Sequence, residues 1–372
     1  MHIMSTPFCI YSIWSLIMDY KTYRKQINKT MAKSRIPCDG FFELTGRCNL
    51  DCRMCYIHYG SNDHFFTDEK DGDWWIQRID EAYQSGLMFA LLTGGECMLH
   101  PDFERIYLHL RELGVYTRVN TNGLLLTDQR IEFFKRYPPI EIQVTLYGSD
   151  DEHYKQVTGH SVFSSVDSAL KKLKDNDLRF IVAITPCKYT FDDLRNMISY
   201  LRLHQYPFYG SGYIFEANKN TGRTIEEYNL SVDKMVLYEE MLYGKKYDPI
   251  PYDELPPAGG STREQKFGIT CTAGHSAYLI TWDGFLQPCT SHQSIRVKCD
   301  SFSNAWNELT KIADQYRLPV ECEGCAFISV CKKCVAYRTQ GAEPGHCNPY
   351  VCELTKRLIS AGVLPFHLET TN

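Results

Sequence analysis

Between residues 41 and 243, short runs rich in β-branched and aromatic residues alternate with longer stretches whose apolar residues recur at helical spacing. The short runs predict strands at residues 41–45, 88–93, 116–121, 140–146, 179–185 and 209–215. The longer stretches predict helices at residues 74–84, 102–113, 128–136, 163–173, 191–203 and 232–242. A repeated strand–helix unit with short connections favours parallel strands and right-handed crossovers. The pattern therefore predicts an α/β fold, a partial (β/α)6 TIM-like barrel.

Changes in composition divide the chain into five predicted segments. A stretch rich in Pro, Gly and charge follows the barrel and predicts a linker, beyond which many of the cysteines lie. In this cysteine-rich region, Asp283-Gly284 between two apolar runs predicts a β-hairpin. The segments are an N-terminal extension, the barrel, the linker, a small cysteine-rich domain and a C-terminal helix with a tail, at residues 1–37, 38–243, 244–268, 269–354 and 355–372.

The chain has 16 cysteines among its 372 residues, and seven of them fall in groups of the CxxxCxxC and CxxC type. In a large chain with an α/β pattern, such clusters favour metal or iron–sulfur ligation in a reducing compartment over disulfides. No apolar run reaches the roughly 18 residues of a membrane span, and residues 8–18 lack the flanks of a signal peptide. The net charge of −5 gives no basic field for nucleic acid. We therefore expect a cytoplasmic protein that binds neither membranes nor nucleic acid.

Three cysteines, Cys48, Cys52 and Cys55, follow the first predicted strand in a loop that Gly46 opens. A structural zinc ion and a closed iron–sulfur cluster each require four ligands. Three close thiols without a fourth nearby leave one metal corner free for a small chelating ligand. In barrels of parallel strands, chemistry occurs at the carboxyl ends of the strands, and the triplet lies at such an end.

The triplet, Cys48-Asn-Leu-Asp-Cys52-Arg-Met54-Cys55, resembles the CxxxCxΦC motif of the radical S-adenosylmethionine (SAM) enzymes, in which Φ is apolar or aromatic. The resemblance implies a 4Fe-4S cluster on the three thiols and SAM on its free iron, with Met54 and Tyr56 beside it. It further implies that an electron from a flavodoxin or ferredoxin-like donor splits SAM into methionine and a 5′-deoxyadenosyl radical. That radical then takes hydrogen from the substrate.

Further residues at the ends of predicted strands two to four match the family in order. The resemblance assigns SAM contacts to Gly94, Gly95, Glu96, Asn122, Gln143 and Thr145. Gly94-Gly95-Glu96 resembles the family's GGE, which contacts the amino group of SAM, and a plain glycine turn is the alternative. Gln143 and Thr145 are expected within reach of the ribose or carboxylate, with ordinary polar alternation along a strand as the alternative. The "GSGYIFE" stretch, residues 210–216, is expected to let the backbone approach the adenine.

The C-terminal cysteines resemble the SPASM extension of peptide-modifying family members, which holds two auxiliary 4Fe-4S clusters. Twelve residues separate Cys271 from Gly284 and four more precede Cys289, before the run "CEGCAFISVCKKC". The resemblance gives the first cluster Cys271, Cys289 and Cys334. It gives the second Cys322, Cys325 and Cys331 with either Cys347 or Cys352. Cys299 or a substrate thiolate is the fourth ligand of the first cluster, and a pair of zinc knuckles is the alternative for the whole region.

The stretch "QVTLYGSDDEHYKQVTG", residues 143–159, is similar to maturases of ribosomally made peptides. The leading reaction is therefore a thioether or other cross-link in such a peptide. One alternative is a sulfatase-type maturase, although Thr290 stands where those enzymes carry aspartate. The remaining candidate functions are a peptide epimerase with Cys97 as hydrogen donor, a small-molecule radical dehydrogenase, and a non-enzymatic iron–sulfur or zinc protein. Tyr213 and Asp283 are further catalytic candidates by position.

Only 37 residues precede Cys38, which is too few for the leader-binding domain with which many such maturases begin. We therefore expect either a separate leader-peptide-binding protein or recognition at the mouth of the barrel. Residues 65–75, "FFTDEKDGDWW", are a candidate for a mobile lip, with a solvated helix start as the alternative.

Overall fold

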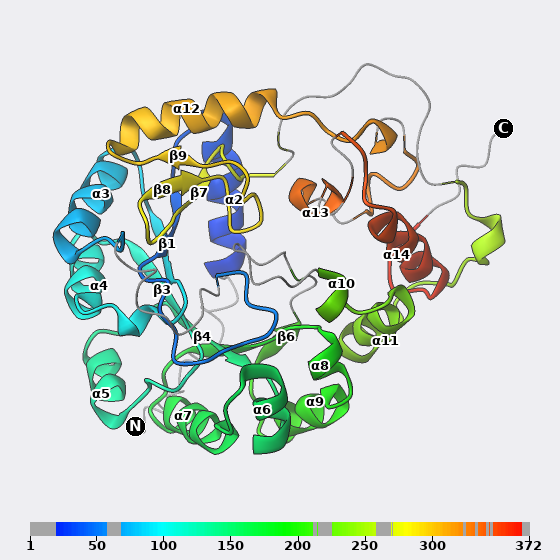
Figure 1. Ribbon diagram of the computed structural model, residues 1–372, viewed down its shortest axis with the longest axis horizontal. Coiled ribbons are helices and arrows are strands. Elements are labelled where there is room, and N and C mark those ends of the chain that lie inside the picture. The colour runs from blue at the N-terminus through cyan, green and yellow to red at the C-terminus, as the bar shows by residue number, and fades with distance from the viewer. Residues whose placement is uncertain are drawn as a thin grey trace, which may run out of the picture.

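The computed structural model describes most of the chain as one large sheet with surrounding helices (Figure 1). The described residues are 20–57, 68–210, 214, 225–257, 269, 271–322, 325–331, 334–339, 342 and 345–366. The strands of the predicted barrel are β1 Asp39–Glu43, β2 Phe89–Thr93, β3 Tyr116–Thr121, β4 Glu141–Leu146, β5 Phe180–Ile184 and β6 Phe208–Gly210. Each pairs in parallel with the next along the chain. The predicted partial barrel is confirmed.

Helices lie on the outer side of the curved sheet (Figure 1). The crossover helices are α3 Gly72–Gln84, α4 Phe103–Glu112, α5 Asp128–Arg136, α7 Phe163–Asp175, α9 Leu194–Leu203 and α11 Val232–Tyr243. Shorter helical segments are η2 Cys97–Leu99, α6 Asp151–Thr158, α8 Lys188–Phe191 and α10 Ile225–Tyr228. Side-chain caps fix several helix starts: Asp71, Thr127 and Ser231 each accept a hydrogen bond from a backbone N–H in the first turn.

Alternation along the strands separates the core from the inner face of the barrel. In β4, Ile142, Val144 and Leu146 are fully buried and belong to the main hydrophobic core. Gln143 and Thr145 between them are half-buried and line a cavity at the carboxyl end of the sheet. Because side chains alternate faces along a strand, one set packs against the helices and the other set faces inward.

The C-terminal region continues the same sheet. Strand β7 Ala277–Ile280 pairs in parallel with β1, and β8 Phe285–Gln287 and β9 Val297–Lys298 follow in antiparallel order. The predicted hairpin is confirmed, since Asp283-Gly284 joins β7 to β8 with Gly284 at a φ of 88°. Helix α12 Phe302–Gln315 packs on α3 and on the hairpin. The predicted domain boundary at residue 268 therefore does not coincide with a break in the sheet.

The N-terminal extension contributes helix α2 Tyr20–Lys33, which covers the amino end of β1. Asn28 donates to the buried carboxylate of Asp39 at 2.5 Å, and Ser276 donates to the carbonyl oxygen of Asn28 at 2.9 Å. Arg24 pairs with the same Asp39 carboxylate at 2.5 Å. These bonds join the extension to β1 and to the start of β7, at the end of the sheet opposite the cysteine triplet.

The described part of the predicted linker is packed against the C-terminal helix. This helix, α14 Pro349–Ser360, contacts α11 and the short segment η3 Tyr252–Glu254. The Tyr252 hydroxyl donates to Glu353 at 2.5 Å, and the backbone N–H of Lys246 donates to Gly362 at 2.9 Å. The remaining short elements are η4 Val320–Cys322 and α13 Val335–Thr339. Among the described residues, none of the helices has the length and apolar character needed to cross a bilayer.

Element boundaries differ from the predictions mainly at the ends of strands. The first strand lies at Asp39–Glu43, two residues earlier than predicted, and leaves Thr45 in the loop that leads to the triplet. The sixth strand covers Phe208–Gly210, while most of the "GSGYIFE" stretch, including Tyr213, lies outside the described residues. In the candidate lip at 65–75, residues 65–67 also lie outside them, and helix α3 begins at Gly72.

The aromatic contact between β1, α3 and β7 offers a test of the core. Phe42 is fully buried, with its ring centroid 6.1 Å from that of Trp75 and 6.2 Å from that of Tyr278. We expect Phe42→Ala to lower the free energy of unfolding by about 3–5 kcal/mol, because it leaves a cavity where three elements meet. Urea unfolding followed by circular dichroism measures this loss. Leu203→Ala, at a position 80% exposed, serves as the control and is expected to change it by at most about 0.5 kcal/mol.

Candidate active site

A cavity of about 220 Å³ opens at the carboxyl ends of the parallel strands. The three thiols of the triplet form part of its wall. Seven of the eight residues predicted to contact a cofactor also line it: Met54, Tyr56, Gly94, Gly95, Asn122, Gln143 and Thr145. The sequence prediction placed these residues together because strand ends meet at one edge of a parallel sheet, and the structure does bring them to one cavity.

Backbone bonds to α6 hold the triplet loop in place. The N–H groups of Asp51 and Arg53 donate to the carbonyl oxygens of Thr158 and Val157, each at 3.0 Å. Cys52 is buried in a small apolar cluster that also contains Val157. The loop is therefore attached to the last turn of α6 on one side of the cavity.

The triplet thiols lie in an environment that favours their neutral form in the absence of a cation. Burial raises the pKa of Cys48 to about 12 and raises that of Cys52 further above its usual range. The Asn122 side-chain amide donates to the Cys48 sulfur at 3.7 Å, and the Tyr147 hydroxyl donates to Cys52. Among the described residues, no three His, Cys, Asp or Glu side chains come close enough to share one metal ion. Three thiols around one cavity, with donors at two sulfurs, suit a cluster whose irons each take one thiolate.

The glycine pair after β2 allows the triplet loop to approach the sheet. Gly94 has a φ of 139°, and a Cβ there would lie 2.4 Å from the carbonyl oxygen of Thr45. A Cβ on Gly95 would lie 2.2 Å from the carbonyl oxygen of Arg47. The Gly95 N–H donates to Thr45 at 2.9 Å. Only glycine permits this close contact between two backbones.

Glu96 lies behind the cavity wall rather than on it. Its carboxylate is fully buried and accepts hydrogen bonds from the Thr121 hydroxyl and the Asn122 N–H, both at 2.8 Å, and from the Met98 N–H at 3.3 Å. Burial raises its pKa. In this structure the predicted SAM contact therefore holds the end of β3, and it reaches the cavity through Asn122.

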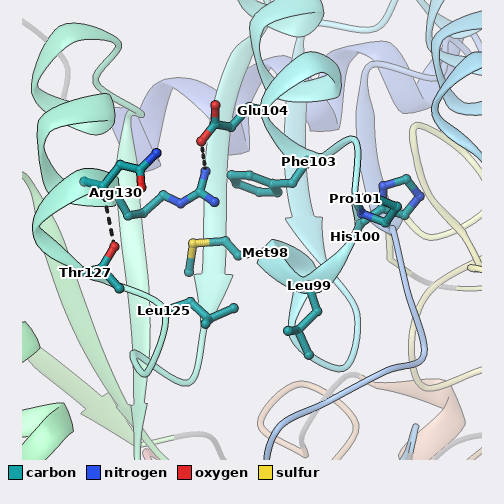
Figure 2. Close-up of a pocket in the computed structure, with 10 residues that line it drawn as sticks. Met98, Leu99, His100, Pro101, Phe103, Glu104, Leu125, Thr127 and Arg130 are labelled. Carbon is teal, nitrogen blue, oxygen red and sulfur yellow. Dashed lines mark hydrogen bonds and ion pairs between the residues drawn. The ribbon is translucent and has the colours of Figure 1, made fainter.

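Two larger grooves lie on the outer side of η2. One, of about 440 Å³, is drawn in Figure 2 and is walled by Met98, Leu99 and Leu125. Its Arg130 is paired with Glu104 at 2.8 Å. The other, of about 500 Å³, contains the Arg47–Glu69 ion pair at 2.8 Å. Neither groove is lined by a cysteine, so the thiol-lined cavity is the candidate site.

The C-terminal cysteines form two groups. Burial and then the neighbouring Cys334 and Cys271 raise the pKa of Cys289 to about 11, which places these three thiols together. In the second group, the sulfurs of Cys347 and Cys352 are 3.5 Å apart. Cys322 interacts with this pair and Cys331 lies near Cys322, while Cys325 packs in the same apolar cluster as Cys331. None of the described cysteines forms a disulfide.

Two predicted roles do not fit the geometry. Cys299 is fully buried in the main core beside Arg78, whereas Cys289 packs in a separate small apolar cluster, so the core rather than a cluster site surrounds the Cys299 thiol. Cys97 is also fully buried, and its thiol donates to the carbonyl oxygen of Asn120 at 3.2 Å, so it does not face the cavity as a hydrogen donor would. Spacing along the chain does not show which side of a strand end a thiol faces.

The catalytic candidate Asp283 lies at the tip of the hairpin. It accepts from the Thr281 hydroxyl at 2.6 Å and pairs with Arg296 at 2.7 Å. The sequence prediction missed its neighbour Glu43, which is buried and bonded to Tyr56. A charged residue in the middle of the predicted strand "FFELT" was the available signal.

Comparison with known proteins confirms the resemblance over the barrel. Residues 42–201 match the model of the Radical SAM superfamily. The chain is 25% identical over 270 residues to the sporulation killing factor maturation protein SkfB of Bacillus subtilis (strain 168), covering 69% of this chain and 61% of SkfB. It is 24% identical over 263 residues to the subtilosin biosynthesis protein AlbA of the same organism, covering 68% and 55%. The chain thus spans about three fifths of the length of these relatives.

Two solved structures share the fold. Streptococcus suis SuiB bound to S-adenosylmethionine superposes with a TM-score of 0.63 at 14% identity, covering 92% of this chain and 85% of SuiB. The protein anSMEcpe with bound AdoMet superposes with a TM-score of 0.63 at 16% identity, covering 87% and 97%. Both likenesses extend beyond the barrel into the C-terminal region.

The buried carboxylate behind the cavity gives a direct test of the site's scaffold. We expect Glu96→Gln to lower the free energy of unfolding by about 1–3 kcal/mol, because an amide nitrogen replaces one acceptor oxygen among three donors. Thermal or urea unfolding measures the difference. Glu104→Gln, a surface carboxylate paired with Arg130, is the matched control and is expected to cost less than about 1 kcal/mol. Equal losses in the two variants would contradict the described geometry.

Proposed function

We propose that this chain, whose residues 42–201 match the model of the Radical SAM superfamily, cleaves SAM reductively and uses the radical to modify a ribosomally synthesised peptide. The observation that carries the proposal is the cavity in which the triplet thiols and the predicted SAM-binding side chains share one wall. Cys48, Cys52 and Cys55 would hold a 4Fe-4S cluster. When bound, the cluster supplies the electron that splits the carbon–sulfur bond of SAM.

The residues opposite the triplet would hold SAM. The Tyr209 hydroxyl donates a hydrogen bond to the Gln143 side-chain oxygen at 2.6 Å. This bond fixes the orientation of the Gln143 amide, which lines the cavity. Asn122 is fixed by Glu96 at its N–H and by Asn49 at its side chain, at 2.8 and 2.7 Å. These hydrogen bonds hold the polar side chains in place before the ligand binds, so binding costs little additional side-chain entropy.

In the proposal, the cysteine-rich C-terminal region binds two auxiliary 4Fe-4S clusters. The first would use Cys271, Cys289 and Cys334, whose proximity in the structure supports the grouping. The second would use Cys322, Cys325 and Cys331 with Cys347 or Cys352. Because Cys299 is buried in the core, the first cluster would keep a corner open for a substrate thiolate.

A peptide substrate is supported by the names of the matching proteins. SkfB is a maturation protein for a killing factor, AlbA takes part in bacteriocin biosynthesis, and SuiB has been crystallised with its precursor peptide SuiA. A thioether or other cross-link is favoured over epimerisation, because the Cys97 thiol does not reach the cavity. A flavodoxin or ferredoxin-like donor, a separate leader-binding protein and a cytoplasmic location complete the proposal.

SAM cleavage is the first test. Under anaerobic conditions with a chemical reductant, we expect the reconstituted protein to convert SAM into 5′-deoxyadenosine and methionine, measured by liquid chromatography. Cys48→Ala, Cys52→Ala and Cys55→Ala each remove one cluster ligand and are expected to reduce 5′-deoxyadenosine to background. Cys38→Ala, at the opposite end of β1, is the matched control and should retain it. Wild-type protein that makes no 5′-deoxyadenosine would refute the proposal.

Removing a C-terminal thiol separates SAM cleavage from peptide modification. We expect Cys271→Ala and Cys289→Ala to retain 5′-deoxyadenosine formation, because the triplet is intact, and to lose the iron of one cluster. Coexpression with the peptide encoded beside the gene, followed by mass spectrometry, should show unmodified peptide with these variants. Zinc in place of iron in this region would contradict the assignment.

A further inference from the structure

A buried acid, Glu43, lies where the triplet loop meets the C-terminal hairpin. It ends β1, the strand that pairs with β2 on one side and with β7 on the other. Its side chain is 3% exposed, and its carboxyl accepts a hydrogen bond from the hydroxyl of Tyr56. Tyr56 follows the last cysteine of the triplet and lines the cavity. Glu43 therefore touches the cavity wall from behind.

The hairpin covers the same place from the C-terminal side. Trp282 is buried and packs against Ile57, Cys55 and Tyr56 in one apolar cluster. Its carbonyl oxygen accepts the N–H of Lys70 at 3.1 Å. The end of the triplet loop is thus held between the end of β1 and the tip of the hairpin.

Among the residues that the structure describes, Asp283 and Arg296 are the charged groups that act on the Glu43 carboxyl, and Tyr56 is its titratable bonding partner. Arg296 is already paired with Asp283 at 2.7 Å, and Thr281 donates to the other Asp283 oxygen at 2.6 Å. Burial first, and then the Asp283 charge, raise the pKa of Glu43 to about 8. The carboxyl is therefore neutral at neutral pH.

We infer that Glu43 is a positioning residue, whose carboxyl holds the Tyr56 hydroxyl and thereby fixes the cavity wall and the end of the triplet loop against the hairpin. The inference rests on the proposed function, because it makes Glu43 a determinant of SAM affinity through Tyr56. Ionisation places a second buried negative charge beside Asp283, with one guanidinium between them. This charge loosens the contact between β1 and the hairpin and weakens SAM binding above about pH 8.

Two substitutions at the same position separate the hydrogen bond from the charge. Glu43→Gln keeps a carbonyl acceptor for Tyr56 but cannot ionise, and Glu43→Met fills the space without an acceptor. Calorimetry on the anaerobic holoenzyme measures the Kd for SAM from pH 6 to pH 9. We expect Glu43→Met to raise Kd about tenfold above that of Glu43→Gln at every pH, because neither side chain ionises and the two differ by one lost hydrogen bond, which corresponds to ~1.4 kcal/mol. Glu43→Gln should stay within about twofold of wild type at pH 7 and should bind more tightly than wild type at pH 9.

The SAM amino group titrates in the same range, but it does so equally with every variant, so the difference between wild type and Glu43→Gln is decisive. Asp283→Asn removes the neighbouring charge and leaves Arg296 to pair with ionised Glu43, so the loss of affinity at high pH is expected to shrink. Glu132→Gln, a surface carboxylate paired with Lys135, is the control and should follow wild type. A wild-type Kd in Glu43→Met, or the same pH profile in Glu43→Gln and wild type, would overturn the inference.

Thermal unfolding tests Glu43 without SAM. The pKa of Glu43 is raised from 4.5 to about 8, so between these pH values the unfolded chain has released a proton that the folded chain keeps. The stability of wild type relative to Glu43→Gln is therefore greatest below pH 4.5 and falls as the pH rises to about 8. We expect Glu43→Gln to melt at least about 2 °C above wild type at pH 9 and less so at pH 5.5. A difference that does not change with pH would overturn the inference, whereas wild type that fails to bind SAM would refute only the proposed function.

Discussion

The main-chain bonds between β1 and β2 determine where the thiol triplet begins. They continue past the ends of both strands and run from Leu44 N to Thr93 O, from Gly95 N to Thr45 O and from Glu96 N to Arg47 O, at 3.0, 2.9 and 2.8 Å. The two glycines are required because a Cβ on either one would collide with a carbonyl oxygen of the facing segment. Cys48 follows directly, so backbone geometry places the first thiol over the sheet before any cofactor binds. The cavity, its polar wall and the hairpin contact all follow from that placement.

The parallel sheet keeps stability and chemistry on separate faces. Residues such as Val144 pack among the helices, while Gln143 and Thr145 beside it face the cavity. A shift of one residue in register would exchange these faces, and it would cost both the core and the site. Polar groups near the cavity are therefore held by strands that the core already fixes. Glu96 shows the same division, because it is buried and holds the end of β3 while Asn122 lines the cavity.

The local pattern predicted most of the barrel, because strand and helix periodicity are properties of neighbouring residues. The seven cavity residues came instead from the resemblance to the radical SAM enzymes, and strand order places the strand ends that carry most of them side by side. It did not predict that β7 would pair with β1, because the two strands are more than 200 residues apart and no periodicity records such pairing. Separation along the chain also hid the electrostatic interaction of Glu43 with Asp283 and the packing of residues 244–257 on α14. Cys97 was a candidate because it follows Glu96, and Cys299 was one alternative for the fourth ligand of the first cluster; the structure buries both in the core, which no local pattern indicated.

The pairing of β7 with β1 changes how the C-terminal region must be understood. If the cysteine-rich region were a separate domain on a linker, its thiols could move freely relative to the triplet. Because β7, β8 and β9 extend the barrel sheet, the segment between Cys271 and Cys299 is fixed to the strand that leads into the triplet. Trp282 then closes the cavity wall from that side. A substrate held at the Cys271 group would therefore keep a constant distance from the radical source, and the buried acid at the junction would couple the binding of SAM to the integrity of that contact.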